Sequence, residues 1–110
     1  MMKMNEHQVT IEARGGGITP DPEELVTVLE HLERDPRLIG PVISGGMGEV
    51  GVTVIIEDDS LDKAVELASA AVGEALVAAG VVSSWQRLGK RDWTRPTNST
   101  AILSAAVQPA

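Results

Sequence analysis

Residues 38–57, LIGPVISGGMGEVGVTVIIE, decide the fold, because they hold two strand-like runs joined by a glycine-rich turn. The second run, residues 49–57, alternates between two sets of side chains and is dense in β-branched residues, which predicts a central strand. The first run, residues 38–44, contains Pro41, which has no N–H to donate, so we expect an edge strand. The glycines within residues 45–48 predict a tight hairpin.

A helix is predicted on each side of this hairpin. Before it, the Asp-Pro pair at residues 21–22 is typical of a helix start, and an apolar stripe follows as far as the Asp-Pro pair at residues 35–36. After it, Ser60 is expected to cap a second helix, which Gly80 ends. The apolar stripe of this second helix is rich in alanine, which allows close packing on a sheet.

Two further alternating runs complete a repeated pattern. Residues 8–14, QVTIEAR, alternate between apolar and polar side chains, which predicts a half-buried strand. Residues 81–88 favour a fourth strand, but either alternate set of its side chains could face inward. The order strand–helix–strand therefore occurs twice along the chain.

This order resembles the ferredoxin-like α+β sandwich, at the level of the fold alone. Right-handed crossovers and an antiparallel hairpin predict a four-stranded antiparallel sheet, in the order 4-1-3-2, with two helices on one face. We expect residues 1–90 to form this single domain. Because many unrelated proteins share the arrangement, it implies no particular activity.

Residues 91–110 are expected to form a C-terminal arm, either an extra strand or disordered. Residues 101–107 of this arm are apolar and tolerate β-structure. Three placements stay open: fraying in solution, folding back on its own domain, or adding to the sheet edge of a neighbouring copy.

The composition excludes several classes of protein. The 110-residue chain has no cysteine, which rules out disulfides and thiolate metal sites. Its net charge of −7 disfavours nucleic acid and anionic membranes as partners. No apolar run approaches about 18 residues and no leader-like segment stands at the start, so we expect a cytoplasmic protein.

The charge is uneven along the chain. Residues 1–86 hold 15 acidic and 5 basic side chains, whereas residues 87–95 hold four basic side chains and one aspartate. Trp93 lies in this basic stretch and Trp85 beside it. We expect the stretch either to settle against the acidic body or to form an oligomer contact or anion site; a basic patch this small is a weak signal for nucleic acid.

The sheet face opposite the helices is expected to carry the functional surface. Alternation places Glu12, Arg14 and Ile55 there, and Trp85 and Arg87 join them if the fourth strand turns that way. Two such faces packed together would hide the apolar side chains and pair glutamate with arginine across a two-fold axis. The ligand or interface candidates are Glu12, Arg14, Ile55, Trp85, Arg87 and Trp93.

No catalytic, metal or cofactor site is predicted. His7 and His31 are expected at the surface, without a second ligand at metal-binding spacing. The glycines at 15–17 match no phosphate-binding motif, and the acidic helix start after them would repel an anion. The aspartates at 58–59 are expected to start the second helix rather than to chelate a cation.

Two function classes remain. The first is a small soluble homo-oligomeric module, most simply a dimer, with a non-catalytic binding or accessory role on the open sheet face and a small ligand or protein as partner. The second is a cofactor-free enzyme whose active site lies in a barrel-like cavity of a dimer. A concave site of a few hundred Å³ with convergent polar groups would favour the enzyme.

Overall fold

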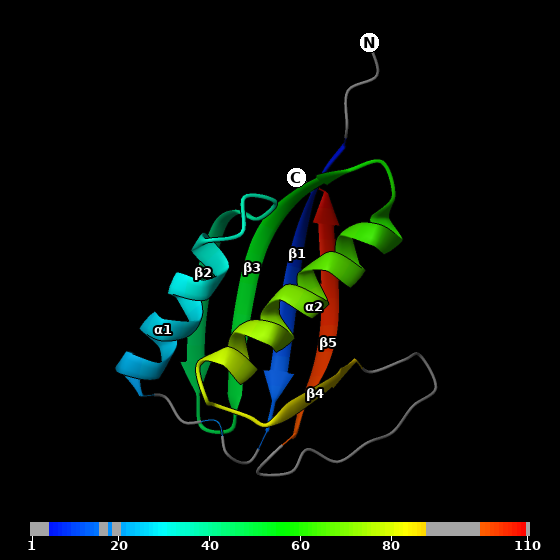
Figure 1. Ribbon diagram of the computed structural model, residues 1–110. Coiled ribbons are helices and arrows are strands. Elements are labelled where there is room, and N and C mark those ends of the chain that lie inside the picture. Colours follow the sequence, from blue (N-terminus) through cyan, green and yellow to red (C-terminus); the bar gives the residue numbers. More distant parts are fainter. Residues whose placement is uncertain (1–4, 16–17, 19–20, 88–99, 110) are drawn as a thin grey trace.

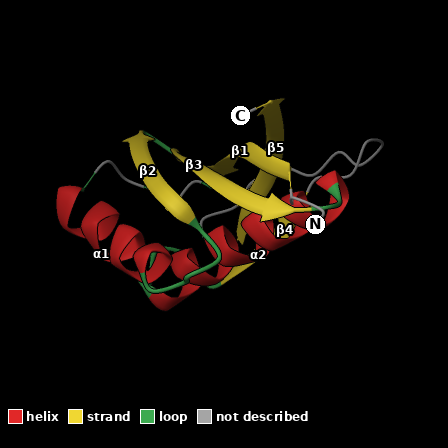
Figure 2. Cartoon of the chain, turned by 90° about the horizontal axis from the view of Figure 1, so that it is seen from above, coloured by secondary structure: helices red, strands yellow, loops and turns green. Residues whose placement is uncertain are grey.

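Two helices cover one face of a five-stranded sheet, so the fold is α+β with two layers (Figures 1 and 2). The computed structural model describes residues 5–15, 18, 21–87 and 100–109. The elements in chain order are β1 (Asn5–Arg14), α1 (Pro22–Glu33), β2 (Ile39–Gly46), β3 (Glu49–Asp58), α2 (Leu61–Ala78), β4 (Ser84–Arg87) and β5 (Thr100–Pro109).

The strand order in the sheet is β2-β3-β1-β5-β4. β1 pairs antiparallel with β3 on one side and with β5 on the other, and β2 pairs antiparallel with β3. β4 pairs with β5 in parallel, which makes the sheet mixed. In Figure 1, β4 lies beside only the lower part of β5.

The sheet differs from the four-stranded antiparallel sheet that the repeat predicts, because β5 lies between β1 and β4. Ala101 and Leu103 of β5 are almost fully buried in the core, so apolar burial favours this position. The predicted boundary between residues 90 and 91 lies outside the described residues. The fourth strand is also shorter than predicted, since it begins only at Ser84.

The hairpin and the edge position of β2 follow the prediction. The chain turns between Gly46 and Glu49, and Gly48 adopts a φ of 77° that glycine permits. The pairing of β2 with β3 shifts register between Ile39 and Val42, around Pro41. A bulge and a proline at this edge are features that discourage pairing with another strand.

Both helix starts are confirmed. The Asp21 side chain accepts a hydrogen bond from the Glu23 N–H at 2.9 Å, and the Ser60 hydroxyl accepts one from the Lys63 N–H at 3.4 Å. Neither α1 nor α2, within the described part of the chain, is long and apolar enough to span a membrane.

Gly80 ends α2 as predicted. The Gly80 N–H donates to the Val77 carbonyl and the Val81 N–H to the Leu76 carbonyl, both at 3.0 Å, while Gly80 has a φ of 77°. These two bonds form a Schellman motif.

The hydrophobic core lies between the sheet and the helices. Alternate residues of β1, β3 and β5 face it, together with the inner stripes of α1 and α2. Its largest almost fully buried side chains are Val9, Ile11, Val28, Leu32, Val50, Val52, Val54, Ile56, Val72, Leu76 and Leu103.

Candidate functional site

The sheet face turned away from the helices, here called the open face, carries three of the predicted site residues. Cross-strand register sets Glu12 of β1 opposite Gly51 of β3 and Ser104 of β5. Arg14 lies two residues further along β1 and Ile55 lies on β3, so alternation puts all three side chains on this side. No described helix lies over the open face (Figure 2).

Arg14 forms an ion pair on the open face. Its Nε lies 4.0 Å from Oε2 of Glu49, its cross-strand neighbour, and both side chains are more than half exposed. A pair at this distance and exposure contributes little to stability. The Arg14 guanidinium is therefore available to a partner.

A small hollow opens in the open face beside Glu12. Its volume is about 140 Å³, and it is lined by Glu12, Ser44, Gly45, Gly46, Glu49, Val50 and Gly51. A Cβ built on Gly51 would lie 3.1 Å from the Ser44 hydroxyl, so the lack of a side chain there helps to open the hollow. Sites for small-molecule substrates usually measure about 300–1,000 Å³, and this hollow is smaller.

An apolar patch lies at the β2 side of the open face, and we call Ile39, Val42 and Ile55 the apolar corner. Ile39 is paired with Ile55, and Val42 with Thr53. The exposed fractions are 42% for Ile39 and 65% for Val42. Exposed β-branched residues grouped in this way are typical of an interaction surface.

Trp85 and Arg87 lie on the helix side of the sheet, so the fourth strand, whose orientation alternation left open, does not bring them to the open face. Trp85 pairs with Ala101 and Arg87 with Leu103, and both partners face the helix-side core. The Trp85 indole packs on Gly73 of α2, where even a single Cβ would collide with the ring. The missing side chain of Gly73 thus makes room for the indole on this side of β4.

The remaining candidate, Trp93, lies outside the described residues. Ile39 and Val42 were missed, although β2 gave a signal for them. The run from Val42 to Ser44 alternates, so a buried-side Ile43 implies an outward Val42. Pro41 interrupts this alternation, so the pattern does not extend to Ile39 and did not predict its side of the sheet.

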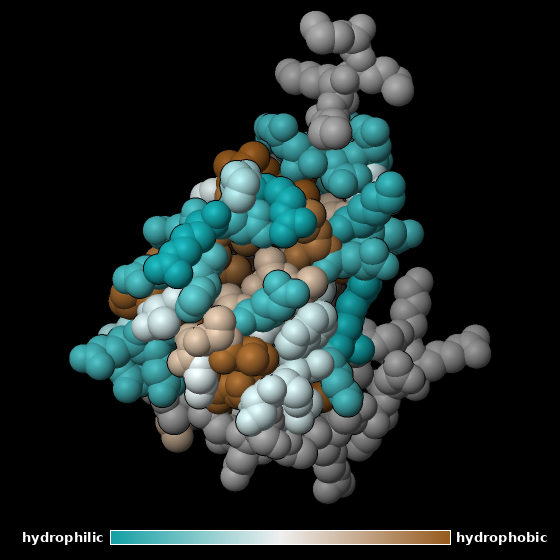
Figure 3. All heavy atoms as spheres, in the orientation of Figure 1, coloured by the Kyte–Doolittle hydropathy of each residue, from teal (hydrophilic) through white to brown (hydrophobic). Residues whose placement is uncertain are grey.

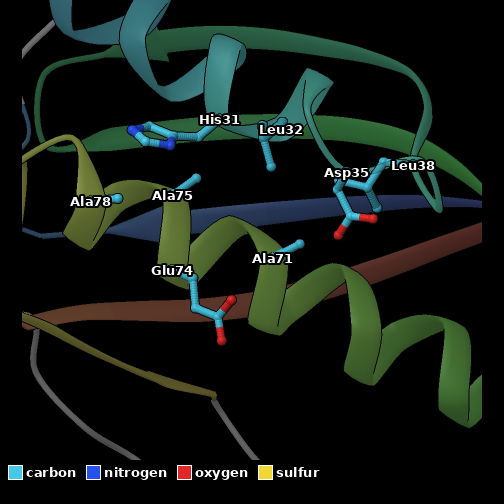
Figure 4. Close-up of a pocket in the computed structure, with 8 residues that line it drawn as sticks. All are labelled: His31, Leu32, Asp35, Leu38, Ala71, Glu74, Ala75 and Ala78. Atoms are coloured by element: carbon cyan, nitrogen blue, oxygen red, sulfur yellow. The ribbon is translucent and has the colours of Figure 1, made fainter.

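A second hollow, here called the inter-helix groove, lies between the end of α1 and the C-terminal half of α2 (Figure 4). Its volume is about 250 Å³. Surface of moderate hydrophobicity is visible between the two helices in Figure 3, flanked by hydrophilic side chains. The groove is lined by His31, Leu32, Asp35, Leu38, Ala71, Glu74, Ala75 and Ala78.

Asp35 at this groove is held by Arg37. The Arg37 Nε donates to Oδ1 of Asp35 at 2.9 Å and Nη2 donates to Oδ2 at 2.7 Å, while the Arg37 backbone N–H also reaches Oδ1. The side-chain hydrogen bond from Arg37 holds the pKa of Asp35 below its ordinary value, against the opposing effect of burial. Asp35 is thus a fixed negative charge at the rim.

The histidines do not form a metal site with the described carboxylates. His7 lies within hydrogen-bond distance of the Asp58 carbonyl, with Nε2 at 3.0 Å from the oxygen. His31 lines the inter-helix groove, and its ring points along α1 and away from the Asp35 carboxylate (Figure 4). Within residues 5–15, 18, 21–87 and 100–109, no three histidine or carboxylate side chains are grouped to hold a metal ion.

Comparisons with protein-family models, with curated proteins and with solved structures gave no match for this chain. Function is therefore inferred from the geometry of the described surfaces.

Proposed function

We propose that this chain is a small non-catalytic module that self-associates, with a second copy packed against the open face. The apolar corner carries this proposal. Val42 is 65% exposed on a sheet whose other side is buried under two helices. Covering Val42, Ile39 and Ile55 with the same patch of a second copy removes apolar surface from water, which favours association.

The open face has the size that a two-fold contact needs. Strands of about ten residues rise roughly 3.3 Å per residue, and four neighbouring strands span about 20 Å. The face therefore offers on the order of 600 Å² per copy, which is at the low end of stable interfaces. We expect a dimer of moderate affinity.

Charge on the open face opposes the contact at low salt. Among the described residues of β1 and β3, the register places Glu6, Glu12, Glu49 and Glu57 on this face, with Arg14 as the cation beside them. A two-fold axis lets Arg14 of one copy meet Glu12 of the other, but the acidic excess of both faces remains. Because salt screens such repulsion, self-association should strengthen as ionic strength rises.

The dimensions of the hollow favour a binding role over catalysis. The hollow beside Glu12 has a volume of about 140 Å³, below the range of typical substrate sites. Polar groups from both β1 and β3 line it, but Ser44 has no histidine among the described lining residues to act as its base. We therefore propose the module rather than the enzyme.

Sedimentation velocity of the full chain and of two matched valine variants tests this function. Val42→Glu places a charge in the apolar corner, whereas Val26→Glu places the same charge on α1, where Val26 is 53% exposed. We expect the wild-type chain and Val26→Glu to sediment as dimers at high micromolar concentration, and Val42→Glu as a monomer. Circular dichroism should show the same secondary structure in all three.

Three results would contradict the proposal. A wild-type chain that remains monomeric at high concentration and high salt would overturn self-association. A Val42→Glu variant that still dimerises, or a Val26→Glu variant that dissociates equally, would overturn the open face as the contact.

A further inference from the structure

Residues 104–109 of β5, here called the free half, form a sheet edge on the side away from β1, where no described strand pairs with them. β4 pairs with β5 only from Thr100 to Leu103, whereas β1 pairs with β5 as far as Pro109 (Figure 1). Every second residue of an antiparallel strand directs its N–H and C=O away from its partner strand. These outward groups of the free half can therefore pair with a further strand.

The free half lacks the features that protect the β2 edge. Its register with β1 continues without a bulge, no residue of β5 is charged, and no proline lies within residues 104–108. Ala105, Ala106 and Val107 are exposed, and their small side chains do not block an approach from the edge. β2, in contrast, carries Pro41 and a register shift. The free half is thus the edge suited to strand addition.

The start of α2 projects past the free half. α2 packs on both β4 and β5, and its first turns lie beyond β5 on the side away from β1 (Figures 1 and 2). Asp62, Glu66 and Gly73 follow one another at intervals of four and seven residues, so they share one side of α2. Gly73 is buried against Trp85 of β4, but Asp62 and Glu66 are exposed. The side of α2 that β4 covers at Gly73 is thus uncovered beside the free half, where β4 does not extend.

We propose that the free half adds an extended basic peptide of a partner protein to the sheet, as a strand beneath the start of α2. Main-chain hydrogen bonds to the free half hold the peptide. Lysine or arginine at alternate positions of the peptide lays its aliphatic stem beside Ala105 and Val107, which face the helix side. The charged ends reach the carboxylates of Asp62 and Glu66.

Charge and space favour a peptide over a second copy at this edge. Pairing of two free halves about a two-fold axis would bring two projecting α2 starts together, each with the carboxylates of Asp62 and Glu66. A single extended segment needs only the spacing of one strand, about 4.8 Å. Arg87, on the row of Leu103, is a cation at the β4 end, so the basic residues of the peptide belong near the start of α2. This edge is separate from the open face, and the site therefore goes beyond the proposed self-association.

Titration of the ¹⁵N-labelled full chain with the peptide acetyl-Thr-Lys-Val-Lys-Val-Thr-amide, followed by NMR, tests the site. We expect the amide signals of residues 104–109 to shift and their hydrogen exchange to slow, with a Kd on the order of 0.1–1 mM because the peptide is short. A peptide with glutamate in place of lysine should bind at least about fivefold more weakly. A peptide with proline in place of valine keeps the charge but cannot form a regular strand, and should be weakened at least as much.

Matched variants separate the site from general attraction to an acidic protein. Glu66→Gln should weaken binding of the lysine peptide about threefold, as expected for an exposed ion pair. Glu74→Gln removes the same charge from an exposed position on the α1 side of the same helix and should leave binding unchanged. At the exposed Ala105, Ala105→Glu should strengthen binding and Ala105→Lys should weaken it, each about threefold.

Several outcomes would overturn the site. These are equal binding of the glutamate or proline peptide, shifts absent or located at β2, equal losses in Glu66→Gln and Glu74→Gln, and the same response in both Ala105 variants. Slow exchange in the free half that appears without peptide as protein concentration rises would assign the edge to a second copy instead. A dimer in sedimentation that takes up no peptide would remove only this site, and a monomer that binds the peptide would remove only the proposed self-association.

Discussion

At the scale of single residues, Ser60 and Ser69 show that the same hydroxyl can stabilise the fold at one position and destabilise it at another. The Ser60 hydroxyl caps α2, whereas the Ser69 hydroxyl is buried with no hydrogen-bond partner in the described part of the chain. We expect Ser60→Ala to lower the free energy of unfolding by about 1 kcal/mol. Ser69→Ala should leave it unchanged or raise it, because alanine removes an unsatisfied polar group.

Urea denaturation of the two serine variants and the wild type measures this difference. The pair is matched, since both substitutions delete one hydroxyl from the same helix. A loss in Ser69→Ala as large as that in Ser60→Ala would show that the Ser69 hydroxyl has a stabilising partner.

The Asp35–Arg37 pair predicts a dependence on pH. Arg37 holds the pKa of Asp35 below its ordinary value, so the pair stabilises the fold above the ordinary pKa of an aspartate. This stabilisation is lost as the pH falls through the lowered pKa. Arg37→Gln should raise the pKa of Asp35 towards its ordinary value and move the onset of acid unfolding to higher pH.

An NMR titration of the side-chain carboxyl of Asp35 checks the change, with Arg34→Gln as the control. Arg34 is exposed at the end of α1 and is absent from the causes of the Asp35 shift. An Asp35 pKa that does not move in Arg37→Gln, or moves equally in Arg34→Gln, would contradict the assignment.

At the scale of elements, β5 holds one side of the sheet together. It covers the flank of β1, and in the described residues it is the strand with which β4 pairs. Leu103 is 1% exposed and Val107 is 36% exposed. Leu103→Ala should therefore lower the free energy of unfolding by about 2–4 kcal/mol, and Val107→Ala by less than about 1 kcal/mol, in urea denaturation. Similar losses at both positions would contradict this placement of β5.

Local signals predicted most elements but not the position of β5. Asp21, Ser60 and Gly80 act through neighbours within four residues, so their roles could be read from the chain itself. The position of β5 depends on how β1 and β4 accommodate a strand between them. An apolar run such as residues 101–107 does not specify its partner strand, and three placements stayed open for that reason.

At the scale of the whole molecule, the two sides of the sheet carry different surfaces. In the proposed dimer, the open face would present the apolar corner and an acidic excess to a second copy, whereas the helix side carries the inter-helix groove. If self-association proceeds as proposed, the dimer measured by sedimentation should tighten when salt rises from about 50 mM to about 500 mM. A dimer that dissociates over this range would show that ion pairs, rather than the apolar corner, carry the contact.

The candidate site was predictable only where strand alternation fixes the side of the sheet. Glu12, Arg14 and Ile55 lie on long, regular strands, and alternation placed them on one face. Trp85 lies on a four-residue strand, and its indole occupies the space that the lack of a side chain at Gly73 leaves on α2. This packing joins residues of two different elements, so the alternation pattern of the sequence does not reveal it.

The packing of Trp85 on Gly73 has a practical consequence for optical measurements. The chain has two tryptophans and no tyrosine or phenylalanine, so its aromatic absorption and fluorescence come from Trp85 and Trp93. Replacing Trp93 would leave one fluorophore, half-buried where β4 meets α2. The emission of that single indole would then report the separation of the sheet edge from the helix layer, without any attached dye.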